Sequence, residues 1–208
     1  PMDGISIIIC HHRGDLIGKC IKSIFLSKNV IFEIIIAPSD EQCEKMYHKS
    51  VPEVTAIYCP GGPARKRNVA FRYTQYPYIA FFDDDTEICE YTFEEMLKVL
   101  KQSSVGMVYG KLLNMERRNQ FDEAGSYLTW TGFLWARAES GVYDNGQFDQ
   151  IEPVLAGKSA ACMIHKKVFV DAGMFDPSFE ILAEETDLSW RVWLLGFKVL
   201  YVPKSVTY

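Results

Sequence analysis

The sequence predicts an α/β fold in which a mostly parallel sheet is flanked by helices and followed by a smaller mixed region. Two observations support this prediction. Short apolar runs rich in β-branched residues alternate with amphipathic helical patterns, and polar clusters follow the ends of those runs. The 208 residues, 48% of them hydrophobic, suffice for the core of one domain over residues 1–208. No apolar run approaches the roughly 20 residues that a membrane span requires.

The first half predicts alternating strands and helices. Residues 5–10 form a continuous apolar run, which is typical of a strand buried on both faces. Residues 16–26 repeat apolar side chains at helical spacing. The pattern then predicts strands at 32–36, 54–58 and 78–82, a short helix after Asp40 and a longer helix at 64–73. This alternation indicates a parallel sheet whose strands end at one common edge.

The second half has a different organisation. It predicts a helix at 92–101, a strand at 105–113, and helices at 166–172 and 183–195. Between them lie a small apolar segment, 157–164, and a long polar segment, 116–152, that carries seven aromatic residues. The long segment is interpreted either as a lid or substrate platform or as an edge hairpin packed on the core.

Three consecutive acids, Asp83, Asp84 and Asp85, follow the strand predicted at 78–82. Adjacent carboxylates repel one another, and oxygen ligands suit Mg²⁺ or Mn²⁺ when a substrate diphosphate completes the shell. The triplet therefore predicts a divalent cation site. The alternative is an acidic turn in which Asp85 or Thr86 caps the next helix.

A glycine-rich turn, 60–63, opens the helix predicted at 64–73, and four polar residues follow it at 65–68. Helix N-terminal amides and cations suit a phosphate, although a solvated basic turn has the same composition. Because ligands bind outside the carboxyl ends of parallel strands, this turn, the acids and the polar residues after 5–10 and 32–36 should share one crevice.

The helix predicted at 183–195 begins with Glu184, Glu185 and Asp187. Acids at a helix start interact favourably with the helix dipole, and Asp187 with Arg191 forms an i,i+4 pair. The functional alternative is that one carboxylate faces a cleft as a general base.

Charge and cysteine spacing exclude several other classes. A net charge of −5 argues against nucleic acid as the main partner, because phosphate backbones require a basic field. The six cysteines lack the paired spacing of zinc or redox motifs, so reduced thiols in a cytosolic protein are expected.

Taken together, four motifs in order resemble the family 2 glycosyltransferases, which have the GT-A fold. After the first buried strand and its His-Arg loop come Gly-Gly-Pro-Ala-Arg-Lys-Arg-Asn at 61–68, Tyr-Ile-Ala-Phe-Phe-Asp-Asp-Asp-Thr at 78–86, Gly-Met-Phe-Asp at 173–176 and Glu-Glu-Thr-Asp-Leu-Ser-Trp-Arg at 184–191. The resemblance covers essentially the whole chain, and it implies a final strand at 196–203 after the last helix. It implies a nucleotide-sugar-binding half at 1–113 and an acceptor and catalytic half at 114–208.

The resemblance also implies roles for individual residues. Asp85, with Asp83 as its partner, would bind Mn²⁺ or Mg²⁺, and Glu185 of the Glu184-Glu185 pair would be the catalytic base. Contacts to the nucleotide or substrate would come from His11, Arg13, Asp40, Arg67, Asn68, Asp84 and Trp135. The implied activity is inverting transfer of a sugar from a nucleotide-diphosphate donor to a glycan or lipid-linked acceptor, as in polysaccharide biosynthesis.

Three departures from the family pattern bear on these roles. The second predicted strand ends in Ala37-Pro38-Ser39-Asp40, where the family usually has an Asp that contacts the nucleotide base. Glu185 replaces the Asp that usually serves as catalytic base. The family often has a histidine metal ligand just beyond the last strand, whereas this sequence stops at Tyr208. We therefore expect a chain truncated from a longer protein, located in the cytoplasm, with peripheral membrane association through the missing C-terminal region. The alternatives are a nucleotidyltransferase and a catalytically silent nucleotide-sugar-binding module.

Overall fold

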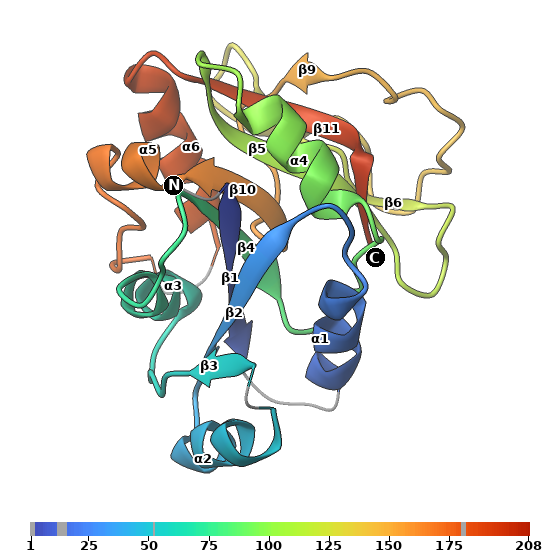
Figure 1. Cartoon of the computed structure of the whole chain (residues 1–208). Coiled ribbons are helices and arrows are strands. Elements are labelled where there is room, and N and C mark those ends of the chain that lie inside the picture. Colours follow the sequence, from blue (N-terminus) through green and yellow to red (C-terminus); the bar gives the residue numbers. More distant parts are fainter. Residues whose placement is uncertain (1–2, 12–15, 52, 180–181) are drawn as a thin grey trace.

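The computed structural model describes residues 3–11, 16–51, 53–179 and 182–208, with the side chains of 48–50 left aside (Figure 1). Its main sheet confirms the predicted α/β class. The strands lie in the order β3 (Val54–Ala56), β2 (Ile31–Pro38), β1 (Gly4–His11), β4 (Tyr78–Asp83), β10 (Ala161–His165), β5 (Val105–Leu113), β11 (Lys198–Thr207) and β9 (Glu152–Pro153).

The first four of these strands are parallel, as the alternating pattern predicts. The helices between them are α1 (Ile17–Phe25), α2 (Glu41–Ser50) and α3 (Pro63–Phe71). The strand predicted at 54–58 is shorter, since β3 ends at Ala56. The chain nevertheless continues beside β2, because Ile57 N donates to Ile36 O at 2.9 Å and Cys59 N to Pro38 O at 3.0 Å.

The small apolar segment 157–164 contributes a central strand that its sequence pattern does not predict. β10 pairs antiparallel with both β4 and β5. Its small apolar residues suit a strand and a buried turn equally, so only the neighbouring strands decide its structure. The helices of this half are α4 (Thr92–Leu100), α5 (Lys166–Asp171) and α6 (Glu184–Leu194).

Segment 116–152 contains a small hairpin outside the main sheet. β6 (Phe121–Glu123) pairs with β5, whereas β7 (Ser126–Leu128) and β8 (Leu134–Ala136) pair only with each other among the described strands. The tip of this hairpin exposes Trp130 almost fully, at 97%. Of the two interpretations of segment 116–152, a lid or an edge hairpin packed on the core, the hairpin is closer to the structure. The tip of the hairpin is nevertheless not packed on the core.

The core occupies both faces of the sheet, which explains the continuous apolar run of β1. Ile5, Ile7 and Ile9 pack into one buried cluster, and Ile8 packs into the cluster on the other face. Side chains alternate along a strand, so a strand covered on both faces favours apolar residues at successive positions. The buried exception within the run at 5–10 is Ser6, whose hydroxyl donates to Glu33 Oε1 at 2.6 Å.

The parallel strands end level with one another, which positions the polar residues that follow them. His11 of β1 is in register with Pro38 of β2, and Cys10 with Asp83 of β4. All six cysteines are free thiols, as the sequence predicts. Among the described residues, no helix has the length and apolar character needed to cross a membrane.

Candidate active site

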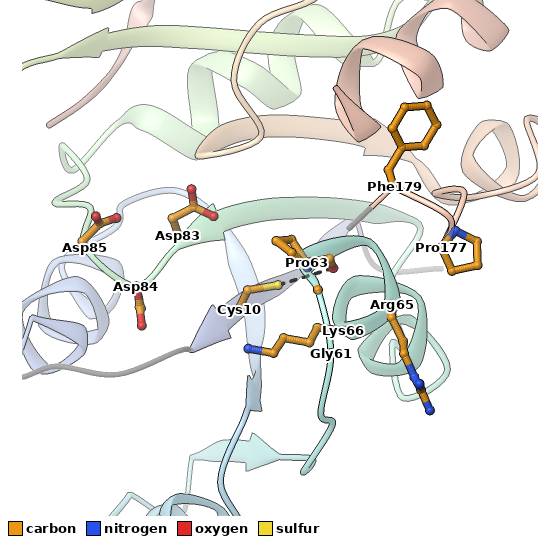
Figure 2. A pocket seen from close by; sticks show the side chains of 11 residues that line it. Cys10, Gly61, Pro63, Arg65, Lys66, Asp83, Asp84, Asp85, Pro177 and Phe179 are labelled. Atoms are coloured by element: carbon orange, nitrogen blue, oxygen red, sulfur yellow. Dashed lines mark hydrogen bonds between the residues drawn. The ribbon is translucent and has the colours of Figure 1, made fainter. Parts of the chain in front are cut away.

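A cleft of about 730 Å³ opens at the carboxyl edge of the parallel strands (Figure 2). It brings together the acidic triplet, the glycine-rich turn and the start of α3, as the sequence predicts. The described residues that line it are Cys10, Gly61, Gly62, Pro63, Arg65, Lys66, Asp83, Asp84, Asp85, Pro177 and Phe179. Pro177 and Phe179 come from the loop before α6, which sequence reasoning did not assign to the site.

The three aspartates diverge at the end of β4. In Figure 2 the Asp83 and Asp85 carboxylates point to one side of the loop and Asp84 to the other. The Asp84 Oδ2 atom lies 2.6 Å from His11 Nδ1, which joins two residues predicted to contact substrate. Asp83 and Asp85 also line a second cavity of about 280 Å³, together with Asp122 and Lys158. Asp83 and Asp85 therefore line both the cleft and the smaller polar cavity.

The chemistry of this pair fits a divalent cation bound together with a substrate. In the described part of the chain, no group of three or more His, Cys, Asp or Glu residues is arranged to hold a metal by itself. Mg²⁺ typically takes one or two carboxylates from the protein and completes its shell with water and substrate phosphates. Asp83 and Asp85 supply that kind of partial, oxygen-only donor set.

The glycine-rich turn and the start of α3, with the cations Arg65 and Lys66, line the cleft. Gly61 adopts a φ of 115°, which a residue with a side chain rarely takes, and Pro63 occupies the first helical turn. Arg65 is exposed and lines the cleft. Because the first amides of a helix lack intrahelical partners, this turn can bind an anion.

Lys66 lines the cleft, but the sequence does not distinguish it from the other cations of the basic run at 65–67. Its ammonium is buried and donates to His11 O at 2.9 Å and to Ser39 Oγ at 2.5 Å. Burial lowers the pKa of Lys66. The contacts tie the ends of β1 and β2 together beneath the cleft. They also hold the backbone of His11, whose ring meets Asp84.

Arg67 links the acidic triplet to the helix that carries the predicted base. Its guanidinium, 2% exposed, donates to Asp83 Oδ1 at 3.1 Å and to Glu184 Oε1 at 2.8 Å. Burial lowers the pKa of Arg67, but surrounding negative groups that include Asp83 and Glu184 outweigh it and raise the pKa overall. Arg67 is not among the described residues lining the cleft. Arg67 is therefore a buried cation that connects the Asp83 and Glu184 carboxylates.

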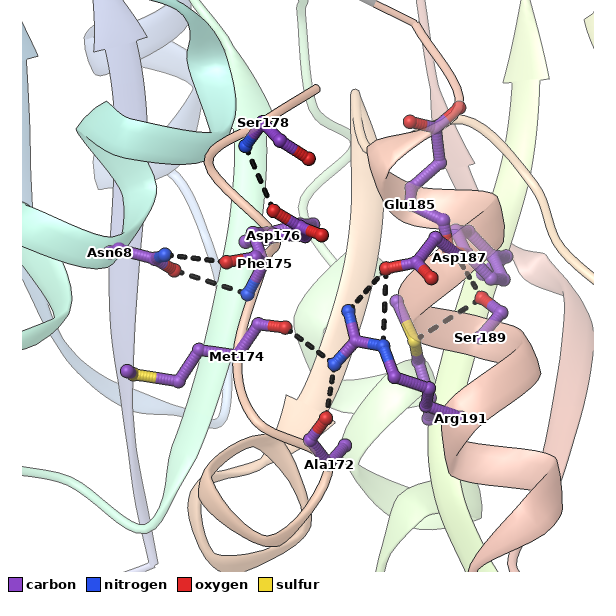
Figure 3. Close-up of polar contacts among 12 residues, drawn as sticks. Asn68, Ala172, Met174, Phe175, Asp176, Ser178, Glu185, Asp187, Ser189 and Arg191 are labelled. Carbon is purple, nitrogen blue, oxygen red and sulfur yellow. Dashed lines mark hydrogen bonds and ion pairs between the residues drawn. The ribbon is translucent and has the colours of Figure 1, made fainter. Parts of the chain in front are cut away.

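Asn68 uses its whole side-chain amide to hold the loop before α6 (Figure 3). Its Nδ2 donates to Phe175 O at 2.7 Å, and its Oδ1 accepts from Phe175 N at 3.2 Å. Arg191 supports the same loop by donating to Met174 O at 2.8 Å. The Arg-Asn pair at 67–68 thus orients the far wall of the cleft, which includes Phe179.

Glu185 projects beyond the N-terminal end of α6, away from Asp187 and Arg191 (Figure 3). The helix is anchored beneath it, since the Tyr109 hydroxyl lies 2.7 Å from Ser189 Oγ. Burial, and then the charge of Glu184, raise the pKa of Glu185 from 4.5 to about 7. A carboxyl group with such a pKa is suited to accept a proton near neutral pH. Because the folded-state pKa is raised, its protonation stabilises the fold below pH 4.5, and that contribution is lost as pH rises through about 7.

Replacing Glu184 with Gln is expected to move the pH profile of any reaction that uses Glu185 as base. The substitution removes the second cause of the raised pKa, so the acid limb of kcat/KM should shift to lower pH. The measurement is kcat/KM from pH 5 to 9. Asp187→Asn in the same helical turn is the matched control, and an unshifted limb in Glu184→Gln would contradict the coupling.

Among the described residues predicted to contact the substrate, only Asp84 lines the cleft, whereas His11, Arg67 and Asn68 act through the contacts given above, and Asp40 and Trp135 lie elsewhere. The Asp40 carboxylate caps α2 by accepting from Gln42 N at 2.7 Å. Trp135 lies on β8 of the small hairpin and is 62% exposed. Arg13 falls outside the described residues. The roles of these residues, like those of the other predicted site residues, stay predictions.

A parallel sheet whose edge brings carboxylates opposite a glycine-led, cationic helix start is typical of α/β domains that bind nucleotides. A comparison with models of protein families shows to which family within this class of nucleotide-binding domains the chain belongs. The model of "Glycosyl transferase family 2" matches residues 6–165, which is more than half of the chain. The chain therefore belongs to glycosyltransferase family 2. A comparison with curated proteins finds no match.

The structure is also similar to a crystal structure of GalNAc-T7 with UDP, GalNAc and Mn²⁺. The TM-score is 0.77 at 14% sequence identity, and the alignment covers 99% of this chain and 43% of that chain. At this identity the similarity supports the fold alone, and it confirms the expected GT-A architecture. The chain spans less than half the length of the protein that it matches.

Proposed function

We propose that the protein is a metal-dependent, inverting glycosyltransferase that moves a sugar from a nucleotide-diphosphate donor to an acceptor hydroxyl. The observation that carries the proposal is the cleft that Asp83–Asp85 and the start of α3 line together. Membership of glycosyltransferase family 2 supports it. So does the similarity to a protein crystallised with UDP and Mn²⁺.

The donor diphosphate would lie between the α3 amides, Arg65 and a divalent cation at Asp85 and Asp83. A bound Mn²⁺ or Mg²⁺ would offset the negative charge that develops on the departing diphosphate. Asp84, held by His11 at 2.6 Å, would contact the nucleoside on the opposite side of the loop. Arg67 and Asn68 would act on the donor by positioning Asp83 and the Phe175 loop.

The transfer step would be a single displacement. Glu185 would take the proton of the acceptor hydroxyl while that oxygen forms a bond to the anomeric carbon. The bond from the anomeric carbon to the diphosphate oxygen would break on the opposite face, and the nucleoside diphosphate would leave with the electron pair. The configuration of the anomeric carbon would thereby be inverted. A glycan or a lipid-linked sugar would serve as acceptor.

Replacing Asp85 with Asn is expected to abolish the metal-dependent part of nucleotide binding. Calorimetric titration of UDP, GDP and dTDP should show binding that Mn²⁺ strengthens in the unmodified protein. Asp85→Asn should bind equally weakly with and without the ion, because a carboxylate oxygen donor is lost. Asp171→Asn, in an exposed ion pair on α5, is the control. Failure of every nucleotide to bind the unmodified protein would contradict the proposed function.

Experiments on the same site distinguish the proposed transferase from two other functions. A silent nucleotide-sugar-binding module would bind the donor but show no dependence of turnover on Glu185. A nucleotidyltransferase would attach a nucleotide to its product, and product analysis by mass spectrometry detects that difference. The raised pKa of Glu185 favours the transferase, because a binding module has no need of a base near neutrality.

A further inference from the structure

The Lys66 ammonium is a buried donor whose contacts within the described structure leave one N–H group for a ligand. Lys66 is 3% exposed, yet it lines the cleft. An ammonium carries three N–H donors, and two of them reach His11 O at 2.9 Å and Ser39 Oγ at 2.5 Å. Because a buried donor without an acceptor is costly, the third N–H group suits an acceptor that a ligand brings into the cleft.

The place of Lys66 in the fold separates its ammonium from the predicted metal site. The strands at the cleft lie in the order β2, β1 and β4. Asp83 ends β4, whereas Lys66 binds the last residue of β1 and Ser39, which follows β2. Neighbouring strands are about 4.8 Å apart, so the end of β2 lies two strand spacings, about 10 Å, from the end of β4. A ligand that contacts both places must extend across the end of β1.

A nucleoside diphosphate has this extended form. With its diphosphate at the cation site beside β4, its ribose would cross the end of β1, where Asp84 meets His11. Its base would then reach the end of β2, where Lys66 meets Ser39. In Figure 2 the Lys66 ammonium and the Asp84 carboxylate lie on the same side of the aspartate loop, opposite the Asp83 and Asp85 carboxylates. That is the side on which the nucleoside would lie.

Charge and hydrogen bonding favour a base with a carbonyl group beside Lys66. Burial lowers the pKa of Lys66, while the nearby Asp84 carboxylate acts in the opposite direction. That carboxylate would repel a phosphate placed next to the ammonium, whereas a base is neutral. An ammonium can only donate, so the base must offer an acceptor. The O4 atom of uracil or thymine and the O6 atom of guanine accept, whereas the amino groups of cytosine and adenine donate.

We propose that Lys66 selects the nucleobase of the donor by donating a hydrogen bond to a carbonyl oxygen, O4 of uracil or thymine or O6 of guanine. Ser39 Oγ and the His11 carbonyl would hold the ammonium in place for this contact. The inference rests on the proposed function for the position of the diphosphate. It restricts the donor to a sugar linked to UDP, dTDP or GDP, and it excludes cytosine and adenine nucleotides.

The test is calorimetric titration of UDP, CDP, GDP and ADP in the presence of Mn²⁺. In the pair that the site accommodates, UDP with CDP or GDP with ADP, the nucleotide with the carbonyl group should bind about 10–100-fold more tightly. In Lys66→Gln this ratio should fall to about one, because an amide can donate or accept. Arg65→Met is the matched control. It removes the exposed cation of the same helical turn, so it should weaken both nucleotides equally and leave the ratio unchanged.

A second measurement uses the unmodified protein alone. The diphosphates of pyrimidin-2-one riboside and of purine riboside lack the O4 and O6 atoms, so they should bind as weakly as CDP and ADP. Equal affinity for nucleotides with carbonyl and amino groups would overturn the proposal. So would a loss of affinity in Lys66→Gln that leaves the ratio unchanged, because Lys66 would then act on the diphosphate or on the fold. Failure of every nucleotide to bind would contradict the proposed function, whereas binding without discrimination would contradict only the role of Lys66.

Discussion

Glu185→Gln is expected to lower kcat for sugar transfer by about 10²–10⁴-fold, the contribution typical of a general base. The amide keeps the shape of the side chain but cannot accept the proton of the acceptor hydroxyl. Donor affinity should stay unchanged, because Asp83–Asp85 and the start of α3 line the cleft whereas Glu185 is not among its described lining residues. Single-turnover transfer rates and calorimetric donor affinity are the two measurements.

The control for this variant is Asp187→Asn, in the same turn of α6. It should retain most of the turnover, since Asp187 pairs with Arg191 and does not face the end of the helix. Turnover of Glu185→Gln equal to that of the unmodified protein would refute the base assignment. Loss of donor affinity together with turnover would instead indicate that the substitution disturbs the cleft.

Arg67→Met is expected to destabilise the protein by about 3–5 kcal/mol, because it removes one partner of a buried ion pair. Glu184 is 4% exposed, and its Oε2 atom already lacks a hydrogen-bond partner within the described structure. The substitution would leave that carboxylate buried without its counter-charge. The pair with Asp83 should contribute less, because the Asp83 side chain is 40% exposed.

Urea unfolding measures this effect as a shift of the midpoint at constant slope. Arg65→Met is the matched control, because Arg65 is the exposed arginine of the same helical turn, and its change should stay within about 0.5 kcal/mol. The double variant Arg67→Met/Glu184→Gln should recover part of the loss, since it removes the orphaned charge as well. Equal midpoints for Arg67→Met and Arg65→Met would exclude a stabilising bridge.

Local patterns predicted much of the parallel half of the fold. The apolar run at 5–10 and the amphipathic run at 16–26 correspond to β1 and α1 because their periods of burial are intrinsic to buried strands and surface helices. The sequence does not predict the central strand β10, because the four small or apolar residues before His165 carry no periodic signal. The antiparallel register that it adopts depends on β4 and β5, which lie far away along the chain.

For the candidate site, local sequence pattern specifies which chemical groups are present and at which strand and helix ends they lie. Acids after β4, glycines and cations at the start of α3, and two glutamates at the start of α6 all follow from local pattern. The partners of these groups depend on how distant segments pack. Arg67 lies between Asp83 and Glu184, Asn68 bonds Phe175, and Lys66 donates to the backbone of His11. Charge and spacing specify what a side chain can bind. Burial and contacts across more than a hundred residues of chain specify what it does bind, and they raise the pKa of Glu185 to about 7.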